Sequence, residues 1–98
     1  MSYVIVFTEL ASDDIDQILE FIAYDSPHRA LNFINTLENR VANVLSQFPY
    51  SGNKYKEAFY FAFDNYVVVY DVDESTKTVN VLLVSEGHRR WSSVLDDR

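Results

Sequence analysis

The first half of the chain contains one short apolar run followed by two long stretches with helical periodicity. Residues 3–7 (YVIVF) are β-branched and aromatic, which predicts a short, largely buried strand. In the next stretch, apolar residues recur every three or four positions and acidic residues fall on or near the opposite face. The apolar positions are Ala11, Ile15, Ile18 and Ile22, and the acidic ones are Glu9, Asp13, Asp14, Asp16 and Glu20. This pattern predicts an amphipathic helix whose acidic face points to solvent.

Residues that cap or break helices mark the ends of two predicted helices. Thr8 is expected to cap the first helix, or Ser12 if that helix starts later, because both side chains accept hydrogen bonds from backbone amides. Ser26-Pro27 predicts the start of a second helix, and Phe48-Pro49 predicts its end after about five turns. Its apolar stripe comprises Ala30, Ile34, Leu37, Val41, Val44 and Phe48, widened by Phe33 and Leu45. Together the two helices should form a hairpin that covers an apolar surface.

The second half of the chain contains three strand-like runs, at residues 57–63, 66–72 and 78–84. Asp64-Asn65 fits a two-residue hairpin turn, and residues 73–77 fit a longer polar turn. The predicted order is therefore β-α-α-β-β-β. It corresponds to an α+β fold, in which the helical hairpin packs on one face of a four-stranded, mainly antiparallel sheet. We expect a single domain over residues 1–98, with residues 92–98 as a flexible tail.

Aromatic residues alternate along the first of these three runs. Phe59, Phe61 and Phe63 should share the face under the helices, which leaves Tyr60 and Ala62 on the opposite face. Tyr66, Tyr70 or the valines of the next strand could join them there. This opposite face either needs a cover, which a partner could supply, or merely carries scattered aromatic residues. Trp91 likewise allows two interpretations, an exposed anchor for a partner or a lid over the core.

Composition narrows the classes of function. A chain of 98 residues with 48% hydrophobic residues fits one packed domain, and two Gly leave no room for Gly-rich phosphate loops. The absence of Cys excludes disulfides and thiol chemistry. The net charge is −7, and residues 1–50 contribute −5 of it, so an anion-binding patch must lie in the second half. The start of the sequence lacks a basic signal segment and no run is long enough to span a membrane, so a cytoplasmic protein is expected.

The order of elements and several short motifs resemble the RelE/ParE superfamily of bacterial type II toxins, and the ParE branch most of all. The resemblance covers about residues 3–91. The matching residues of the first helix are Ala11, Asp14, Ile15, Ile18, Phe21 and Ile22. The other matching segments are Ser26-Pro27, Phe48-Pro49, residues 66–70 and residues 87–90. The resemblance implies a toxin that stabilises a plasmid or genome, inhibits DNA gyrase by binding it, and is neutralised by a cognate antitoxin.

The chain departs from the superfamily where ParE- and RelE-like chains usually place arginines, on the second and third strands. Residues 58–62 and 66–71 contain no basic residue. A ribosome-dependent endoribonuclease, the main alternative, would need a general base and cations around the phosphate. Its candidate residues would be Glu86 or His88 as base, Arg89 and Arg90 as phosphate clamps, and Lys54, Lys56 and Tyr70 as auxiliaries. In the simpler interpretation, Arg89 and Arg90 only solvate the end of the last strand and His88 is a surface residue.

These arguments favour a binding protein over an enzyme, so no catalytic residues are expected. The expected target-binding residues are Arg89, Arg90 and Trp91, and the expected antitoxin-binding residues are Tyr60, Tyr66, Tyr70, Lys54 and Lys56. No metal is expected, because His28 and His88 lie sixty positions apart. We also expect no cofactor, no sequence-specific nucleic acid and no membrane, but a hetero-oligomer with the antitoxin. A third alternative is a family member that has lost toxicity and survives as a pairing module.

Overall fold

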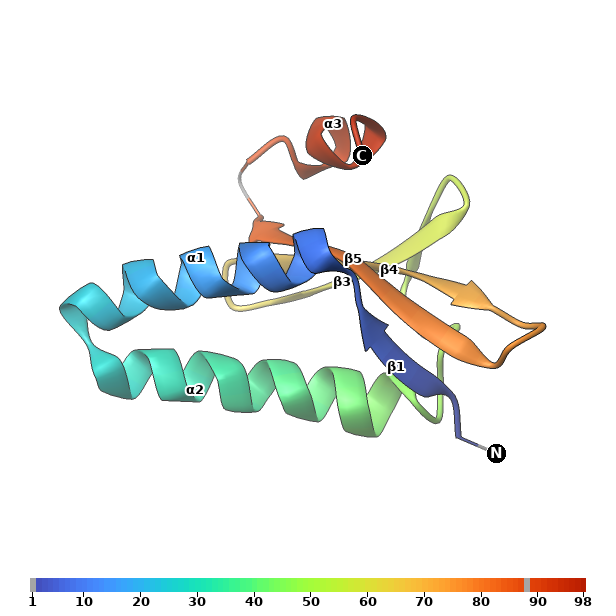
Figure 1. The fold of residues 1–98 in the computed structure, drawn as a ribbon, viewed down its shortest axis with the longest axis horizontal. Helices are drawn as coiled ribbons and strands as arrows, with labels where there is room; N and C mark the ends of the chain where they lie inside the picture. Colours follow the sequence, from blue (N-terminus) through green and yellow to red (C-terminus); the bar gives the residue numbers. More distant parts are fainter. Residues whose placement is uncertain (1, 88) are drawn as a thin grey trace.

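The computed structural model describes residues 2–87 and 89–98, which form a helical hairpin and a sheet followed by a short helix (Figure 1). The elements are β1 (Val4–Phe7), α1 (Glu9–Asp25), α2 (Pro27–Glu38), the π-helix η1 (Asn39–Leu45), β2 (Asn53–Tyr55), β3 (Ala58–Phe63), β4 (Tyr66–Asp73), β5 (Thr78–Glu86) and α3 (Trp91–Asp96). The predicted α+β order is confirmed, and β2 and α3 are added to it. Within the described residues, no helix is long and apolar enough to cross a membrane.

The sheet has five strands in the order β1-β5-β4-β3-β2, so the expected number of four is wrong. The strand β1 is parallel to β5, and the other neighbours are antiparallel. The additional strand, β2, has only three residues, and it pairs Asn53 with Tyr60 and Lys54 with Phe59. So short and polar a segment has no periodicity of its own, and its strand geometry depends on the neighbouring β3.

Both expected helix caps are confirmed. The Thr8 hydroxyl accepts a hydrogen bond from the Ala11 amide at 3.1 Å, and the Ser26 hydroxyl accepts one from the Arg29 amide at 3.3 Å. Pro27 follows at the start of α2, where its missing N–H has no helical partner to lose. The two caps therefore fix the hairpin of α1 and α2, which extends beyond one end of the sheet (Figure 1).

The second helix changes geometry halfway along, where α2 becomes the π-helix η1. Its buried apolar residues are Phe33, Leu37, Val41 and Leu45, each four positions from the last. In a pure α-helix of 3.6 residues per turn such a series would drift around the helix, and the wider π turn offsets this drift. The expected stripe is therefore wrong at its end: Val44 is half-buried and Phe48 is 63% exposed.

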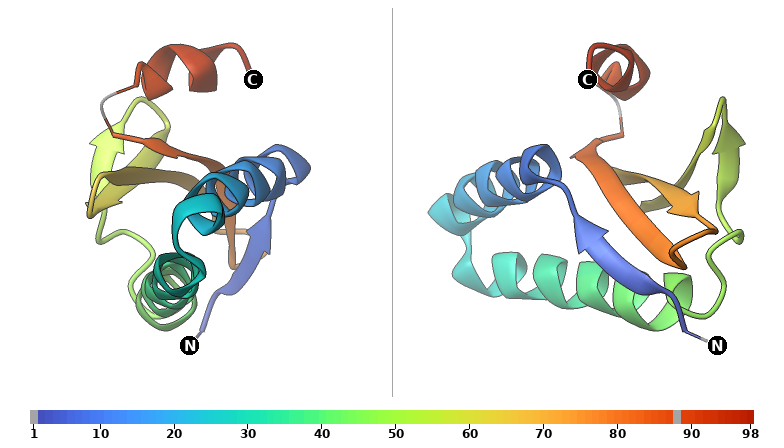
Figure 2. Two further views of the ribbon diagram at one scale, coloured as in Figure 1. Left: turned by 90° about the vertical axis from the view of Figure 1, so that its left-hand side faces the viewer. Right: turned by 45° about the vertical axis from the view of Figure 1, so that its right-hand side comes forward.

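The main core lies between the helical hairpin and one face of the sheet (Figure 2). Phe59, Phe61 and Phe63 point to this face, as predicted. Tyr66 and Tyr70 also belong to it, because they pair across the sheet with Phe63 and Phe59. The expectation that either tyrosine could join Tyr60 on the opposite face is therefore wrong, because strand register and not aromatic character decides the face.

The opposite face carries a smaller apolar cluster covered by α3. Its buried residues are Ala58, Val67, Val69 and Leu83, and the half-buried residues packed on them are Tyr60, Leu82, Trp91 and Leu95. The Trp91 ring lies 5.1 Å from the Tyr60 ring and 5.2 Å from the Tyr55 ring. Trp91 is therefore a lid, and residues 92–98 are not the flexible tail expected, because Trp91–Asp96 form α3 and dock on the sheet.

A polar cluster around Glu74 ties three distant segments together. The Tyr3 hydroxyl donates a hydrogen bond to the Glu74 carboxylate at 2.9 Å, and Tyr50 and Lys77 donate to the same group. These bonds, from Lys77 first and then from Tyr50 and Tyr3, lower the pKa of Glu74 to about 2. The cluster joins the start of β1, the segment before β2 and the turn between β4 and β5.

The lowered pKa of Glu74 makes a prediction for acid stability. Because the folded-state pKa lies below the unfolded value of about 4.3, the stabilisation is complete above that pH and is lost as the pH falls toward 2. We expect Glu74→Gln to lower the free energy of unfolding at pH 7 and to lose this difference from wild type between about pH 4.5 and 2. Urea unfolding of both proteins across this pH range measures the difference in stability. A difference that does not depend on pH would contradict the lowered pKa of Glu74.

The hairpin core supplies a second prediction. Leu37 is 1% exposed between α2 and the sheet, so Leu37→Ala should lower the free energy of unfolding by about 2 to 5 kcal/mol. The matched control is Leu31→Ala on the outer side of the same helix, where Leu31 is 60% exposed and the change should stay within about 0.5 kcal/mol. Equal effects of the two substitutions in urea unfolding would show that the hairpin does not pack as described.

Candidate functional site

The strand β5 continues beyond the end of its parallel neighbour β1. Pairing with β1 ends at Phe7 and Val81, whereas β5 runs on to Glu86. At this point Leu82 forms a bulge, because Val81 pairs with Tyr70 while Leu83 already pairs with the next residue back, Val69. The edge of β5 after Val81 therefore faces α1 instead of another strand, and its backbone groups need other partners.

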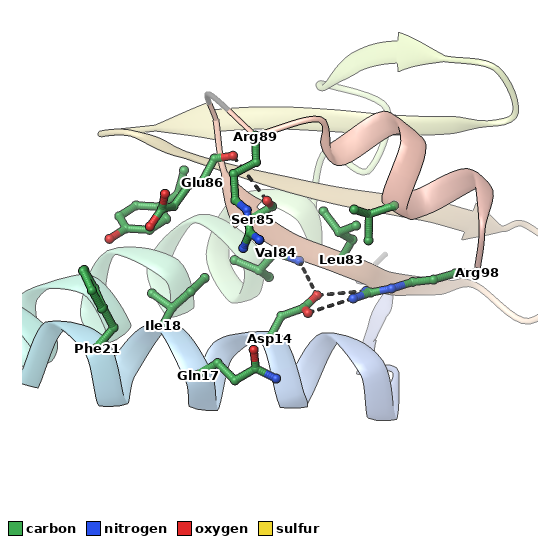
Figure 3. Close-up of a pocket in the computed structure, with 12 residues that line it drawn as sticks. Asp14, Gln17, Ile18, Phe21, Leu83, Val84, Ser85, Glu86, Arg89 and Arg98 are labelled. Atoms are coloured by element: carbon green, nitrogen blue, oxygen red, sulfur yellow. Dashed lines mark hydrogen bonds and ion pairs between the residues drawn. The ribbon is translucent and has the colours of Figure 1, made fainter.

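Asp14 of α1 and Arg98 supply those partners. The Val84 amide donates a hydrogen bond to the Asp14 carboxylate at 3.0 Å, and the Arg98 guanidinium donates one to the Leu82 carbonyl at 2.8 Å. Arg98 also donates two bonds of 2.8 Å to the two oxygens of Asp14 (Figure 3). The hydrogen bond to Asp14 is the main reason that the pKa of Arg98 is raised.

The position of Asp14 corrects the expectation of a wholly solvated acidic face on α1. Its side chain is only 17% exposed, and that of Arg98 is 20% exposed. Periodicity alone could not reveal this role, because it depends on a contact seventy residues away along the chain. Asp14 and Arg98 together join α1, β5 and the segment after α3.

A groove of about 300 Å³ opens beside this ion pair, between α1, the end of β5 and α3 (Figure 3). Its lining residues are Asp14, Gln17, Ile18, Phe21, Tyr66, Leu83, Val84, Ser85, Glu86, Arg89, Val94 and Arg98. Phe21 is 70% exposed at its open end. Arg89 points into the groove, and among residues 2–87 and 89–98 its side chain forms no hydrogen bond or ion pair. The groove thus combines apolar side chains with charged groups of both signs, the carboxylates of Asp14 and Glu86 and the guanidinium groups of Arg89 and Arg98.

The residues expected to bind an antitoxin do not form one surface. Tyr60 lies on the α3-covered face of the sheet, whereas Tyr66 packs edge-on against Phe33 at 4.8 Å on the other face. Tyr70 has no exposed surface, and its hydroxyl accepts a hydrogen bond from the Gly52 amide at 3.0 Å. Tyr70 is therefore inaccessible to a partner in this conformation.

The two expected lysines are also separated. Lys54 lies over the Phe59 ring with its Nζ 4.5 Å from the ring centre. Lys56 forms an ion pair with Asp96 of α3 at 3.0 Å, and the Tyr55 hydroxyl donates to the same carboxylate. Lys56 therefore helps to hold α3 on the sheet, and Lys54 lies apart from it. A second cavity, of about 520 Å³, lies between α3 and the sheet beside this ion pair.

The residues that a ribonuclease would need are dispersed as well. Glu86 pairs with Tyr66 at one end of the sheet, while Lys54 on β2 lies in register with Phe59 and Tyr70 toward the other end. Tyr70 faces the main core. His88 lies outside the described residues. Within those residues, no group of three or more His, Asp or Glu side chains is placed to hold a metal ion.

Of the expected target-binding residues, Arg89 and Arg90 are exposed and adjacent, but they differ in their surroundings. Arg89 lines the groove, whereas Arg90 does not and immediately precedes α3. Trp91 is half-buried against Tyr55 and Tyr60. The structure therefore brings Glu86 and Arg89 together in the groove and gives Trp91 a packing role.

Comparison with protein families identifies the chain. A family model with the description "ParE toxin of type II toxin-antitoxin system, parDE" matches residues 5–91 of the chain. The chain belongs to the ParE toxin family. No match was found among curated proteins. As a member of the ParE toxin family, it is the toxin of a type II toxin–antitoxin pair.

Solved structures share the fold of this ParE family member at low sequence identity. The chromosomal ParDE system of P. aeruginosa superposes with a TM-score of 0.70 at 16% identity, over 87% of this chain and 96% of that chain. A doubly substituted E. coli RelE toxin in the free state gives a TM-score of 0.68 at 18% identity, over 99% and 93%. The toxin–antitoxin complex RelBE2 of Mycobacterium tuberculosis gives 0.62 at 19% identity, over 88% and 99%. The fold is thus shared with solved structures from both the ParE and the RelE branch of the superfamily.

The Asp14 contacts generate a prediction for the site. We expect Asp14→Ala to lower the free energy of unfolding by about 1 to 3 kcal/mol, because it leaves the Val84 amide without its acceptor and Arg98 with the Leu82 carbonyl alone. Hydrogen exchange at the Val84 amide should accelerate in the same variant. Asp13→Ala, on the exposed side of α1, is the control and should change stability by no more than about 0.5 kcal/mol. Unchanged exchange at Val84 would contradict the proposed contact.

Proposed function

We propose that this toxin inhibits DNA gyrase by binding it, that it does not cleave RNA, and that a cognate antitoxin neutralises it in a hetero-oligomer. Membership of the ParE toxin family establishes the toxin–antitoxin context. Gyrase as target follows from the resemblance to the ParE branch. A gyrase inhibitor of this kind acts in the bacterial cytoplasm and stabilises the plasmid or genome that encodes it.

The dispersal of the cations is the observation that best supports binding over catalysis. Cleavage of RNA requires a base, a proton donor and cations gathered around one phosphate. Here Lys56 is engaged with Asp96, Lys54 lies over Phe59, and Tyr70 is buried in the core. A chain with a net charge of −7 would also be repelled by ribosomal RNA. These features leave few accessible side chains for the cleavage of RNA.

The sheet face opposite the hairpin adds to this argument. Residues 58–62 are entirely uncharged, and α3 with its lid Trp91 covers that part of the face. A phosphate backbone would meet an apolar, occupied surface there instead of a row of cations. An accessible charged feature beside β5 is the groove containing Arg89.

The proposal predicts two opposite results for the purified toxin. It should block supercoiling of relaxed plasmid DNA by gyrase, because inhibition requires only binding. It should leave ribosome-bound messenger RNA intact in a translation extract, because Lys54, Lys56 and Tyr70 are engaged elsewhere in the described part of the chain. Premixing with the antitoxin encoded by the neighbouring reading frame is the control and should restore supercoiling.

Codon-dependent cleavage of messenger RNA would contradict the proposal and favour the RelE-like alternative. A protein that inhibits neither process but binds the antitoxin would be a pairing module without toxicity. These three outcomes are read from one plasmid gel, one primer-extension assay and one binding titration.

A further inference from the structure

The side of α1 that faces solvent carries a row of unpaired carboxylates. Each lies three or four residues from the next, so they follow one another every 4.5 to 6 Å, approximately, along the helix axis. The members of the row are Glu9, Asp13, Asp16 and Glu20, and all four are exposed. Among residues 2–87 and 89–98, none of the four forms an ion pair, in contrast to Asp14, which binds Arg98.

This row works against the stability of the helix that carries it. Like charges three or four residues apart on a helix repel each other, and residues 1–28 contain no Lys or Arg to offset that repulsion. A further carboxylate, Asp25, is the last residue of α1, where the negative end of the helix dipole disfavours it. The folding of α1 therefore does not explain why the acidic residues are arranged in this way.

Two large aromatic side chains are exposed beside the row. Tyr24 is 92% exposed one turn after Glu20, and Phe21 is 70% exposed. Together with Gln17 and Glu20 they line a shallow hollow on α1, in the part of the hairpin that extends beyond the sheet (Figure 1). Exposed aromatic residues of this kind are typical of interfaces. A fitting occupant therefore presents a line of cations next to an apolar side chain.

We propose that this outer face of α1, formed by the four carboxylates with Phe21 and Tyr24, binds a basic surface of the toxin's target. Lysines or arginines of the target pair with Asp13, Asp16 and Glu20, and an apolar side chain of the target enters the hollow beside Tyr24. The identity of the target as gyrase rests on the proposed function, whereas the chemistry of the contact rests on α1.

Charge complementarity selects this occupant. An enzyme that binds DNA carries lysines and arginines where it contacts the phosphates, and carboxylates in a row can pair with the same groups. A nucleic acid would be repelled by the row, and so would a second copy of this chain, whose net charge is −7. The target itself is the partner whose charge has the opposite sign.

The decisive experiment makes the same change of charge at two exposed positions. Asp16→Lys should raise the toxin concentration that half-inhibits supercoiling by gyrase about tenfold or more, whereas Glu38→Lys on α2 should raise it less than about threefold. Asp16→Lys should also unfold at a temperature no lower than wild type, because it replaces repulsion from Asp13 and Glu20 by attraction. Equal losses for the two variants, or full inhibition by Asp16→Lys, would overturn the proposal.

The aromatic part of the face is tested in the same assay. Tyr24→Ser should raise the half-inhibitory concentration about fivefold or more, because it removes the exposed ring beside the hollow. The matched control is Leu31→Ser on α2, where Leu31 is 60% exposed, and it should change that concentration less than about twofold. A loss for Leu31→Ser as large as that for Tyr24→Ser would contradict a contact specific to α1.

A further measurement separates the face from the identity of the target. The peptide Ac-Lys-Leu-Lys-Leu-Lys-NH2 at millimolar concentration should shift the amide resonances of Gln17 and Tyr24 in wild-type toxin but not in Asp16→Lys. The same peptide with Gln in place of Lys should shift them far less. Equal shifts with both peptides would overturn the role of charge. Peptide binding by a wild-type toxin that does not inhibit gyrase would support the face and contradict gyrase as the target, whereas inhibition that survives in Asp16→Lys would overturn this inference and leave the proposed function standing.

Discussion

The mismatch in length between β5 and its parallel partner β1 controls the arrangement of the whole molecule. Beyond Val81 the edge of β5 has no strand beside it, and unpaired backbone groups in a packed protein are costly. A carboxylate from α1 and a guanidinium from the segment after α3 take the place of the missing strand. The same two side chains bind each other, so closing the edge also fixes the first helix and the last helix relative to the sheet. An exposed template for edge-to-edge association is thereby avoided.

Features encoded by neighbouring residues could be predicted from the sequence, and features encoded by distant ones could not. The helix caps at Thr8 and Ser26 and the facing of Phe59, Phe61 and Phe63 depend on local spacing, and each was predicted correctly. The role of Asp14 was missed because its partners lie at the other end of the chain, although its place in the family pattern of the first helix was a usable signal. The faces of Tyr66 and Tyr70 depend on strand register, which aromatic composition does not reveal. The groove could not be foreseen either, because α3 contributes to its lining and the sequence had predicted a flexible tail in place of this helix.

Both faces of the sheet are occupied by the chain itself, and this limits what the protein can do. The hairpin fills one face with the main core, and α3 covers much of the other through Trp91 and Leu95. Of the side chains that a ribonuclease would use, Tyr70 is buried in the core, Lys54 lies over the Phe59 ring and Lys56 is paired with Asp96. The groove between α1, the end of β5 and α3 stays accessible beside these covered faces.

The π-helix also bears on how this fold tolerates changes in chain length. A π turn holds one residue more than the α turn it replaces, and here the buried positions Phe33, Leu37, Val41 and Leu45 stay in line only because of it. Loss of a single residue between Leu37 and Val41 would restore the four-three-four spacing of an ordinary α-helix with the same side chains facing the sheet. A one-residue deletion in this part of the chain would therefore leave Phe33, Leu37, Val41 and Leu45 on the buried side of the helix.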